Sequence, residues 1–107
     1  MLAITYGRPQ TRKAAAALAA DLGDATLLAD AAMLDEATSL RMHAVGLLLK
    51  LKAQPGLHHA GLSDPEVSVR LATVDALIKL GAADSLLAAL DDPTLEVRTA
   101  AWKSNLP

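Results

Sequence analysis

Apolar residues recur along this chain at the spacing of a helix that buries one face, and the regularity is greatest between Leu62 and Gly81. This stretch begins with Asp64 and Pro65. The pair suits a helix start, because aspartate accepts hydrogen bonds from free backbone N–H groups and proline has no N–H to leave unpaired. The stretch ends at Gly81, since glycine readily adopts the left-handed conformation that closes many helices. The pattern predicts a helix from Pro65 to Leu80.

The same pattern of polar and apolar positions occurs again after Leu90. Asp64 and Pro65 recur there as Asp92 and Pro93. Arginine marks the equivalent position of every copy, at Arg12, Arg41, Arg70 and Arg98. An internal repeat of this length, about 29 residues, is typical of solenoids built from stacked helix pairs. The chain is therefore predicted to hold roughly four copies of one helix-pair unit.

The limits of the predicted helices follow from the apolar periodicity and from the glycines and prolines between apolar segments. The helices cover, in order, Thr11–Leu22, Ala25–Leu34, the segment from a cap at Asp35 to about Lys52, one or two turns within Leu57–Leu62, Pro65–Leu80, Ala82–Leu90 and Pro93–Leu106. Gly7–Gln10 is predicted to form a turn, and Gln54–Gly56 to break the third helix. Met1–Tyr6 is interpreted as the remnant of an outer helix or as an N-terminal cap.

The segment DPEVSVRLATVDALIKLGAADSLLAALDDPTLEVRTAA, from Asp64 to Ala101, resembles HEAT repeats of the short phycobilisome-lyase type. The shared features are Asp-Pro, then Val-Arg, small residues, Leu and Gly, and a second apolar helix that ends in Leu and Asp. The resemblance is fullest over Leu62–Ala101 and extends to Met33–Leu51. It implies an all-α, right-handed α-α superhelix (a HEAT/armadillo-like solenoid) of about seven helices in a single domain, 1–107, with the second helix of each pair lining a concave face. It implies no chemistry, because one fold serves many functions.

The composition of the chain argues against several classes of function and location. The net charge is −2 and aromatic residues make up 2% of the chain, which argues against a nucleic-acid partner, because such surfaces are basic and often aromatic. No apolar run approaches the roughly 18 residues of a membrane span, and the N-terminus lacks the pattern of a secretory signal. The chain has no cysteine, which excludes disulfides and fits a cytosolic protein, so a cytoplasmic location is predicted.

Two interpretations apply to the repeated arginines and to the aspartates Asp35, Asp64 and Asp92. Arginines in a row could bind an anion. Alternatively, each aspartate caps a helix and each arginine ties adjacent turns together through charge-assisted hydrogen bonds. The structural interpretation is favoured, because the residues recur with the repeat instead of gathering at one place.

The three histidines, His43, His58 and His59, do not form a recognised metal motif. His58 and His59 are adjacent, and neighbouring residues on a helix point about 100° apart, which suits a shared metal poorly. His43 replaces a small residue and is predicted to lie where two helices meet. The chain also lacks a Ser-His-Asp motif, a P-loop and GxGxxG. We therefore predict no catalytic residues, no metal and no cofactor.

Some apolar residues lie outside the helix faces that are predicted to form the core. On the helices that carry the arginines, apolar residues also occur opposite the predicted core face, where a surface helix is normally polar. These residues are Met42, Val45, Leu49, Leu71, Val74, Ile78 and Trp102. An exposed apolar stripe across successive helices usually has a partner. The sequence thus predicts a non-catalytic protein–protein interaction module that binds a helix, a peptide or a second copy of itself, as a homodimer, through this stripe.

Two other functions stay open at this stage. The resemblance also allows an accessory subunit of a bilin-lyase-like enzyme, or a HEAT-like nucleic-acid-processing protein. A purely structural alternative is that the chain is part of a longer array, in which further repeats cover the stripe.

Overall fold

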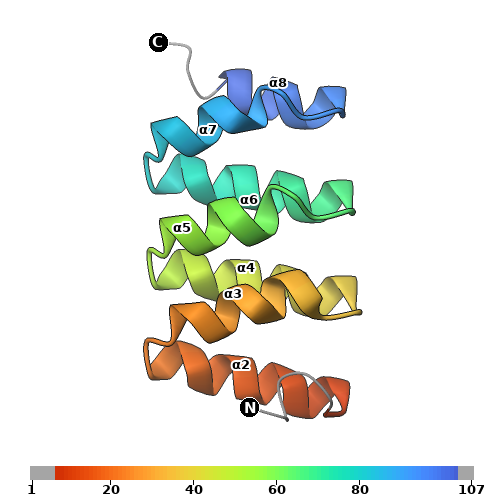
Figure 1. Ribbon diagram of the computed structural model, residues 1–107, viewed down its shortest axis with the longest axis vertical. Helices are drawn as coiled ribbons and strands as arrows, with labels where there is room; N and C mark the ends of the chain where they lie inside the picture. Colours follow the sequence, from red (N-terminus) through yellow and green to blue (C-terminus); the bar gives the residue numbers. More distant parts are fainter. Residues whose placement is uncertain (1–6, 104–107) are drawn as a thin grey trace.

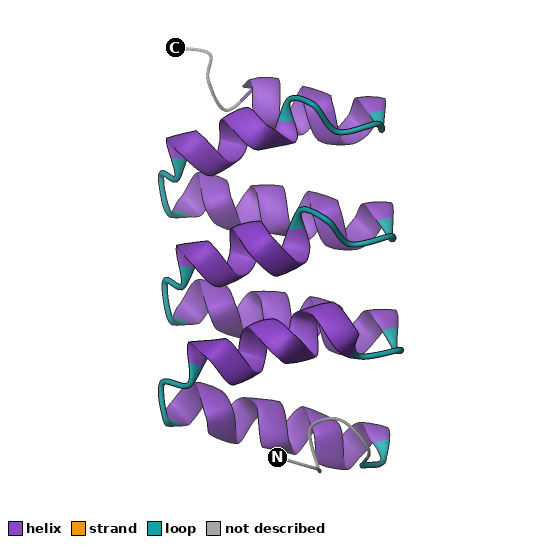
Figure 2. Cartoon of the chain, in the orientation of Figure 1, coloured by secondary structure: helices purple, strands orange, loops and turns teal. Residues whose placement is uncertain are grey.

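The computed structural model describes residues 7–103, and these residues contain helices and no strand (Figure 2). The elements are α2 (Pro9–Asp21), α3 (Ala25–Leu34), α4 (Thr38–Lys50), α5 (Gln54–Gly56), η1 (Leu57–Gly61), α6 (Val67–Lys79), α7 (Ala83–Ala89) and α8 (Leu95–Lys103). Seven are α-helices, and η1 is one π-helical segment that continues α5. The prediction of an all-α fold is confirmed for the described residues.

The helices lie in two layers, one in front of the other, and within each layer they follow one another along the longest axis of the molecule (Figure 1). We call α2, α4, α6 and α8 the arginine layer, because each carries one of the repeated arginines, and α3, α5, η1 and α7 the cover layer. Neighbouring helices of the arginine layer contact each other, for example α4 and α6. They also contact the cover layer: α6 packs against both η1 and α7. The principal extents are 42 × 23 × 16 Å.

Aliphatic side chains fill the space between the two layers. The largest that are fully buried are Leu28, Leu48, Leu57, Leu77, Val69, Val74 and Val97. Alanines fill most of the remaining core positions, especially on α2, where Ala15, Ala16, Ala19 and Ala20 are all buried. Because alanine has a small side chain and the highest helix propensity, it lets helices form and approach closely at once. A core without phenylalanine is built in this way.

Three helices of the arginine layer end in the same manner. The residues after α2 and α6 include Gly23, with φ 72°, and Gly81, with φ 66°, so both glycines adopt the predicted left-handed conformation. The equivalent position after α4 is Lys52, with φ 55°. The N–H after each of these residues donates to a carbonyl five residues earlier, for example Ala82 to Leu77 at 3.0 Å.

Helix starts differ from the predictions by a few residues. The predicted turn at Gly7–Gln10 is wrong in part, because α2 begins at Pro9, where proline fits the first turn. The predicted break at Gln54–Gly56 is also wrong, since the chain turns at Lys52 and α5 begins at Gln54. α6 begins at Val67, two residues after Pro65. The predictions for Met1–Tyr6 and for the last helix beyond Lys103 fall outside the described residues.

At Gly61 the backbone of η1 lies close to α6. A Cβ atom at this position would overlap the side chain of Thr73. Thr73 is fully buried, and its hydroxyl donates to the Val69 carbonyl at 2.8 Å, so it has little room to move. Glycine is therefore needed at position 61 for close approach of backbone, and not for a special φ angle.

Candidate interaction surface

Buried ion pairs join each unit of the arginine layer to the next. Arg12 pairs with Asp35 at 2.9 Å, Arg41 with Asp64 at 2.8 Å and Arg70 with Asp92 at 2.8 Å. In all three pairs the arginine Nε donates to aspartate Oδ2, and every side chain is at most 10% exposed. We call these three contacts the rungs. They agree with the structural interpretation of the repeated residues, because the guanidinium groups are bonded inside the chain.

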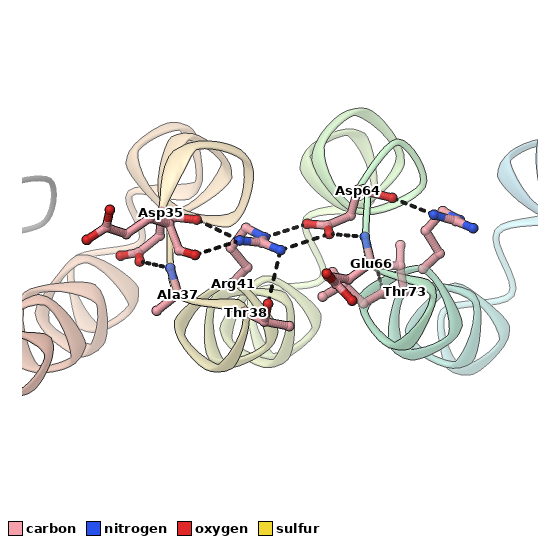
Figure 3. Close-up of polar contacts among 10 residues, drawn as sticks. Asp35, Ala37, Thr38, Arg41, Asp64, Glu66 and Thr73 are labelled. Carbon is pink, nitrogen blue, oxygen red and sulfur yellow. Dashed lines mark hydrogen bonds and ion pairs between the residues drawn. The ribbon is translucent and has the colours of Figure 1, made fainter.

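In the middle rung, the guanidinium of Arg41 donates hydrogen bonds to two different turns (Figure 3). Arg41 donates from Nε to Asp64 at 2.8 Å and from Nη2 to the other carboxylate oxygen at 3.2 Å. Its Nη1 donates to the Asp35 carbonyl at 2.9 Å, in the turn before its own helix. Arg41 thus holds its own turn and the next one together. Such two-pronged guanidinium–carboxylate pairs are among the stronger hydrogen bonds in proteins.

The aspartates organise the turns that precede the helices. Oδ1 accepts the N–H two residues on in each case: Ala37 for Asp35 at 2.9 Å, Glu66 for Asp64 at 2.9 Å and Thr94 for Asp92 at 2.8 Å. The N-cap residues of α4 and α6 are Ala37 and Glu66, and neither makes a side-chain cap. The predicted helix-capping role is therefore corrected: the aspartates fix the turn just before the helix.

The predicted apolar stripe is only partly exposed. Met42, Ile78 and Trp102 are 37%, 40% and 59% exposed, and Leu49 and Leu71 are half-buried. Val45 and Val74 are 3% and 0% exposed, so their prediction as surface residues is wrong. The reason is that a helix of the arginine layer is covered on more than one side. It packs against the cover layer and also against its neighbours in its own layer, so its buried arc is wider than that of a helix with one partner.

Four residues of the stripe remain as a surface on neighbouring helices. Met42 and Leu49 lie on α4, and Leu71 and Ile78 occupy the same positions of the repeat on α6. We call these four the α4–α6 patch. The structure places both α4 and α6 in the arginine layer and in contact with each other. Trp102 does not belong to this patch, because it aligns with the buried Val74 of the preceding copy.

Gly46 lies between Met42 and Leu49 in the sequence and is exposed in the middle of α4. A Cβ at this position would meet nothing within 4 Å, so the fold itself does not require glycine there. Glycine inside a helix costs about 1 kcal/mol relative to alanine. A single glycine inside a helical pattern is tolerated, so the sequence alone gives no reason to predict a role for Gly46.

His43 is half-buried on α4, as expected for a residue where helices meet, and its Nε2 atom is buried without a hydrogen-bond partner. Its pKa is lowered from 6.5, chiefly because burial disfavours the charged imidazolium and also because Lys13 repels it. The neutral ring is therefore the form that the folded chain prefers.

Lowering the pH is expected to destabilise the chain through His43. Below pH 6.5 the unfolded chain takes up a proton that the folded chain still excludes, so the free energy of unfolding falls as the pH drops toward the lowered folded pKa. Urea unfolding between about pH 8 and pH 5 measures this effect. His43→Gln should show a shallower decline than the wild type. Identical profiles for the two chains would contradict the assignment.

The other two histidines, His58 and His59, lie on η1. His58 Nδ1 lies 2.8 Å from Ser85 Oγ on α7, and His59 is exposed. Both line a hollow of about 380 Å³ between η1 and the turn that contains Asp92. Within residues 7–103 no three His, Asp or Glu side chains are grouped closely enough to hold a metal ion.

Comparison with protein-family models, with curated proteins and with solved structures finds no match to this chain. Within residues 7–103, no helix has both the length and the apolar character needed to cross a membrane.

Proposed function

We propose that the chain is a HEAT-like α-solenoid, a right-handed superhelix of helix pairs, and that it serves as a non-catalytic protein–protein interaction module. The α4–α6 patch is its binding surface, and the ligand is a helix of a partner protein. The observation that carries this proposal is the exposure of one apolar side chain on each of two adjacent helices, Met42 at 37% and Ile78 at 40%, while their counterparts in the repeat, Leu71 and Leu49, are half-buried.

A helix is the ligand that fits this surface best. The patch holds two apolar residues on each helix, seven positions apart, which offers two parallel rows of side chains. A partner helix presents its own apolar residues at three- and four-residue spacing and can lie across or between such rows. Gly46 adds open space in the middle of the surface, so that the backbone of a partner helix can come close.

The charges around the patch favour a protein over a nucleic acid. The arginines that dominate this layer, Arg12, Arg41 and Arg70, are buried in ion pairs and cannot neutralise phosphates. Two exposed charges on α6, Asp75 and Lys79, pair with each other at 3.0 Å, so their opposite signs cancel.

Leu71→Glu together with Ile78→Glu is expected to abolish binding and leave the fold intact. Ile78 is 40% exposed and Leu71 is half-buried at the edge of the core, so a glutamate at either position can reach water in the free chain, but a bound helix would bury both charges. Binding is measured by co-purification from cells that naturally make the protein, and light scattering at several concentrations reveals whether the partner is a second copy. Circular dichroism checks the fold.

Leu87→Glu is the matched control for this experiment. Leu87 is an exposed leucine in the cover layer, away from the α4–α6 patch, and its substitution should leave binding unchanged. If Leu87→Glu removes the partner and the double variant keeps it, the binding surface lies on the cover layer and the proposal is wrong.

A further inference from the structure

Two residues of α8 are more exposed than their counterparts in the preceding copy of the repeat. Arg98 and Trp102 stand in the last copy of the repeat where Arg70 and Val74 stand in the copy before it. Arg70 forms a rung, and Val74 is fully buried against its surroundings. Arg98 is half-buried and Trp102 is 59% exposed. The positions that normally face the next unit are therefore open at α8.

Arg98 is already oriented as the arginines of the rungs are. Its Nη1 donates to the Asp92 carbonyl at 2.8 Å, as Arg70 Nη1 donates to the Asp64 carbonyl at 2.7 Å. In the three rungs the Nε of the same guanidinium binds a carboxylate of the following unit. Within the part of the chain that the structure describes, Arg98 has no carboxylate partner. A positioned guanidinium edge thus remains available.

Apolar surface surrounds this guanidinium. Arg98 and Trp102 line a hollow of about 340 Å³ together with Leu90 and Thr99. The earlier residues at the position of Trp102 are Val45 and Val74, which are 3% and 0% exposed because neighbouring helices cover them. An open hollow with a tryptophan and an arginine has the composition of a binding hot spot.

We propose that this hollow binds a helical segment of another protein that carries an aspartate in the turn before a helix. The aspartate binds Arg98 Nε and forms a fourth rung, and the apolar residues of the segment cover Trp102. Charge complementarity with Arg98 selects the carboxylate, and the three existing rungs show the geometry. This surface is separate from the α4–α6 patch.

A second copy of this chain is a poorer occupant than an aspartate-bearing partner. Stacked head to tail, a second copy would bring its first unit against α8. The residue of that first unit which aligns with Asp35 is Tyr6, which carries a phenol and not a carboxylate, and lies outside the described residues. The rung would then lack its acidic half.

The test uses a synthetic peptide with the sequence of residues 83–101, ADSLLAALDDPTLEVRTAA, which supplies the aspartate turn that pairs with Arg70 in the chain. It contains no tryptophan, so the single Trp102 of the full chain reports binding through a blue shift and a rise in its emission. We expect saturable binding. Arg98→Gln in the chain, or Asp92→Asn in the peptide, should weaken it by about tenfold or more.

A tethered form removes the dependence on peptide affinity. In this form residues 104–107 are replaced by a second copy of residues 76–103, with Trp102→Phe in the added copy. The added aspartate then follows Arg98 at the same separation in sequence as Asp92 follows Arg70. We expect a buried Trp102 and a raised urea midpoint, and Arg98→Gln should reverse most of the rise.

Two results would overturn the proposal. One is peptide binding that Arg98→Gln leaves unchanged. The peptide would then bind at Arg70, in place of the chain's own last unit, and not at Arg98. The other is a tethered chain in which Trp102 emission and the urea midpoint do not depend on Arg98.

Discussion

Asp64→Ala is expected to lower the free energy of unfolding by about 3–5 kcal/mol, because it leaves the buried guanidinium of Arg41 without its counter-charge. The Asp64 carboxylate accepts two bonds from Arg41, at 2.8 and 3.2 Å, and one from the Glu66 N–H at 2.9 Å. The loss of a helix-start contact alone costs about 0.5–2 kcal/mol. The expected effect is larger because Asp64 also joins α4 to the next unit. Urea unfolding measures it.

Asp75→Ala is the matched control. Asp75 pairs with Lys79 at 3.0 Å, but both side chains are at least 60% exposed. Exposed pairs four residues apart on a helix contribute only about 0.3–0.5 kcal/mol. A loss at Asp64 no larger than the loss at Asp75 would show that the rungs do not hold neighbouring units together.

Gly61→Ala is expected to lower the free energy of unfolding by about 3 kcal/mol, the upper part of the usual range for overpacking. The added Cβ overlaps the side chain of Thr73, which is fully buried and hydrogen-bonded to the Val69 carbonyl. Either η1 moves away from α6 or the threonine loses its packing. Thermal and urea unfolding measure the change.

Gly46→Ala provides the same substitution where space is open. Its Cβ meets nothing within 4 Å, so the chain should become more stable by about 1 kcal/mol through helix propensity alone. Thr73→Ala should restore part of the stability lost in Gly61→Ala, since it removes the atoms that overlap. If Gly61→Ala is as harmless as Gly46→Ala, the close approach of η1 to α6 is not a real constraint.

The sequence predicts helices well here because their signals are local. The predicted limits of α3, Ala25–Leu34, are the observed ones, and Gly23 and Gly81 end their helices as expected. Helix starts are predicted less well. Aspartate and proline mark the turn before α6 and not its first residue, because the carboxylate of Asp64 binds the Glu66 N–H.

Burial on the surface helices cannot be predicted from periodicity alone. Stepping by about 100° per residue distinguishes one face from its opposite, but it does not reveal how many neighbours a helix has. Val45 and Val74 are predicted to be exposed but are buried, because α4 and α6 have neighbours in both layers. The sequence also does not reveal which aspartate each arginine binds, because each rung joins residues 22 or 23 positions apart.

Site-specific photo-crosslinking is the measurement that tests the proposed binding surface most directly. A photoreactive phenylalanine analogue replaces Ile78 in the α4–α6 patch, or Leu87 in the cover layer as a control, in cells that naturally make the protein. Both side chains are exposed, at 40% and 56%, so both variants should fold. We predict that one defined protein, or a second copy of the chain, is crosslinked from position 78 and not from position 87. Crosslinks from position 87 alone, or the same products from both positions, would contradict the account.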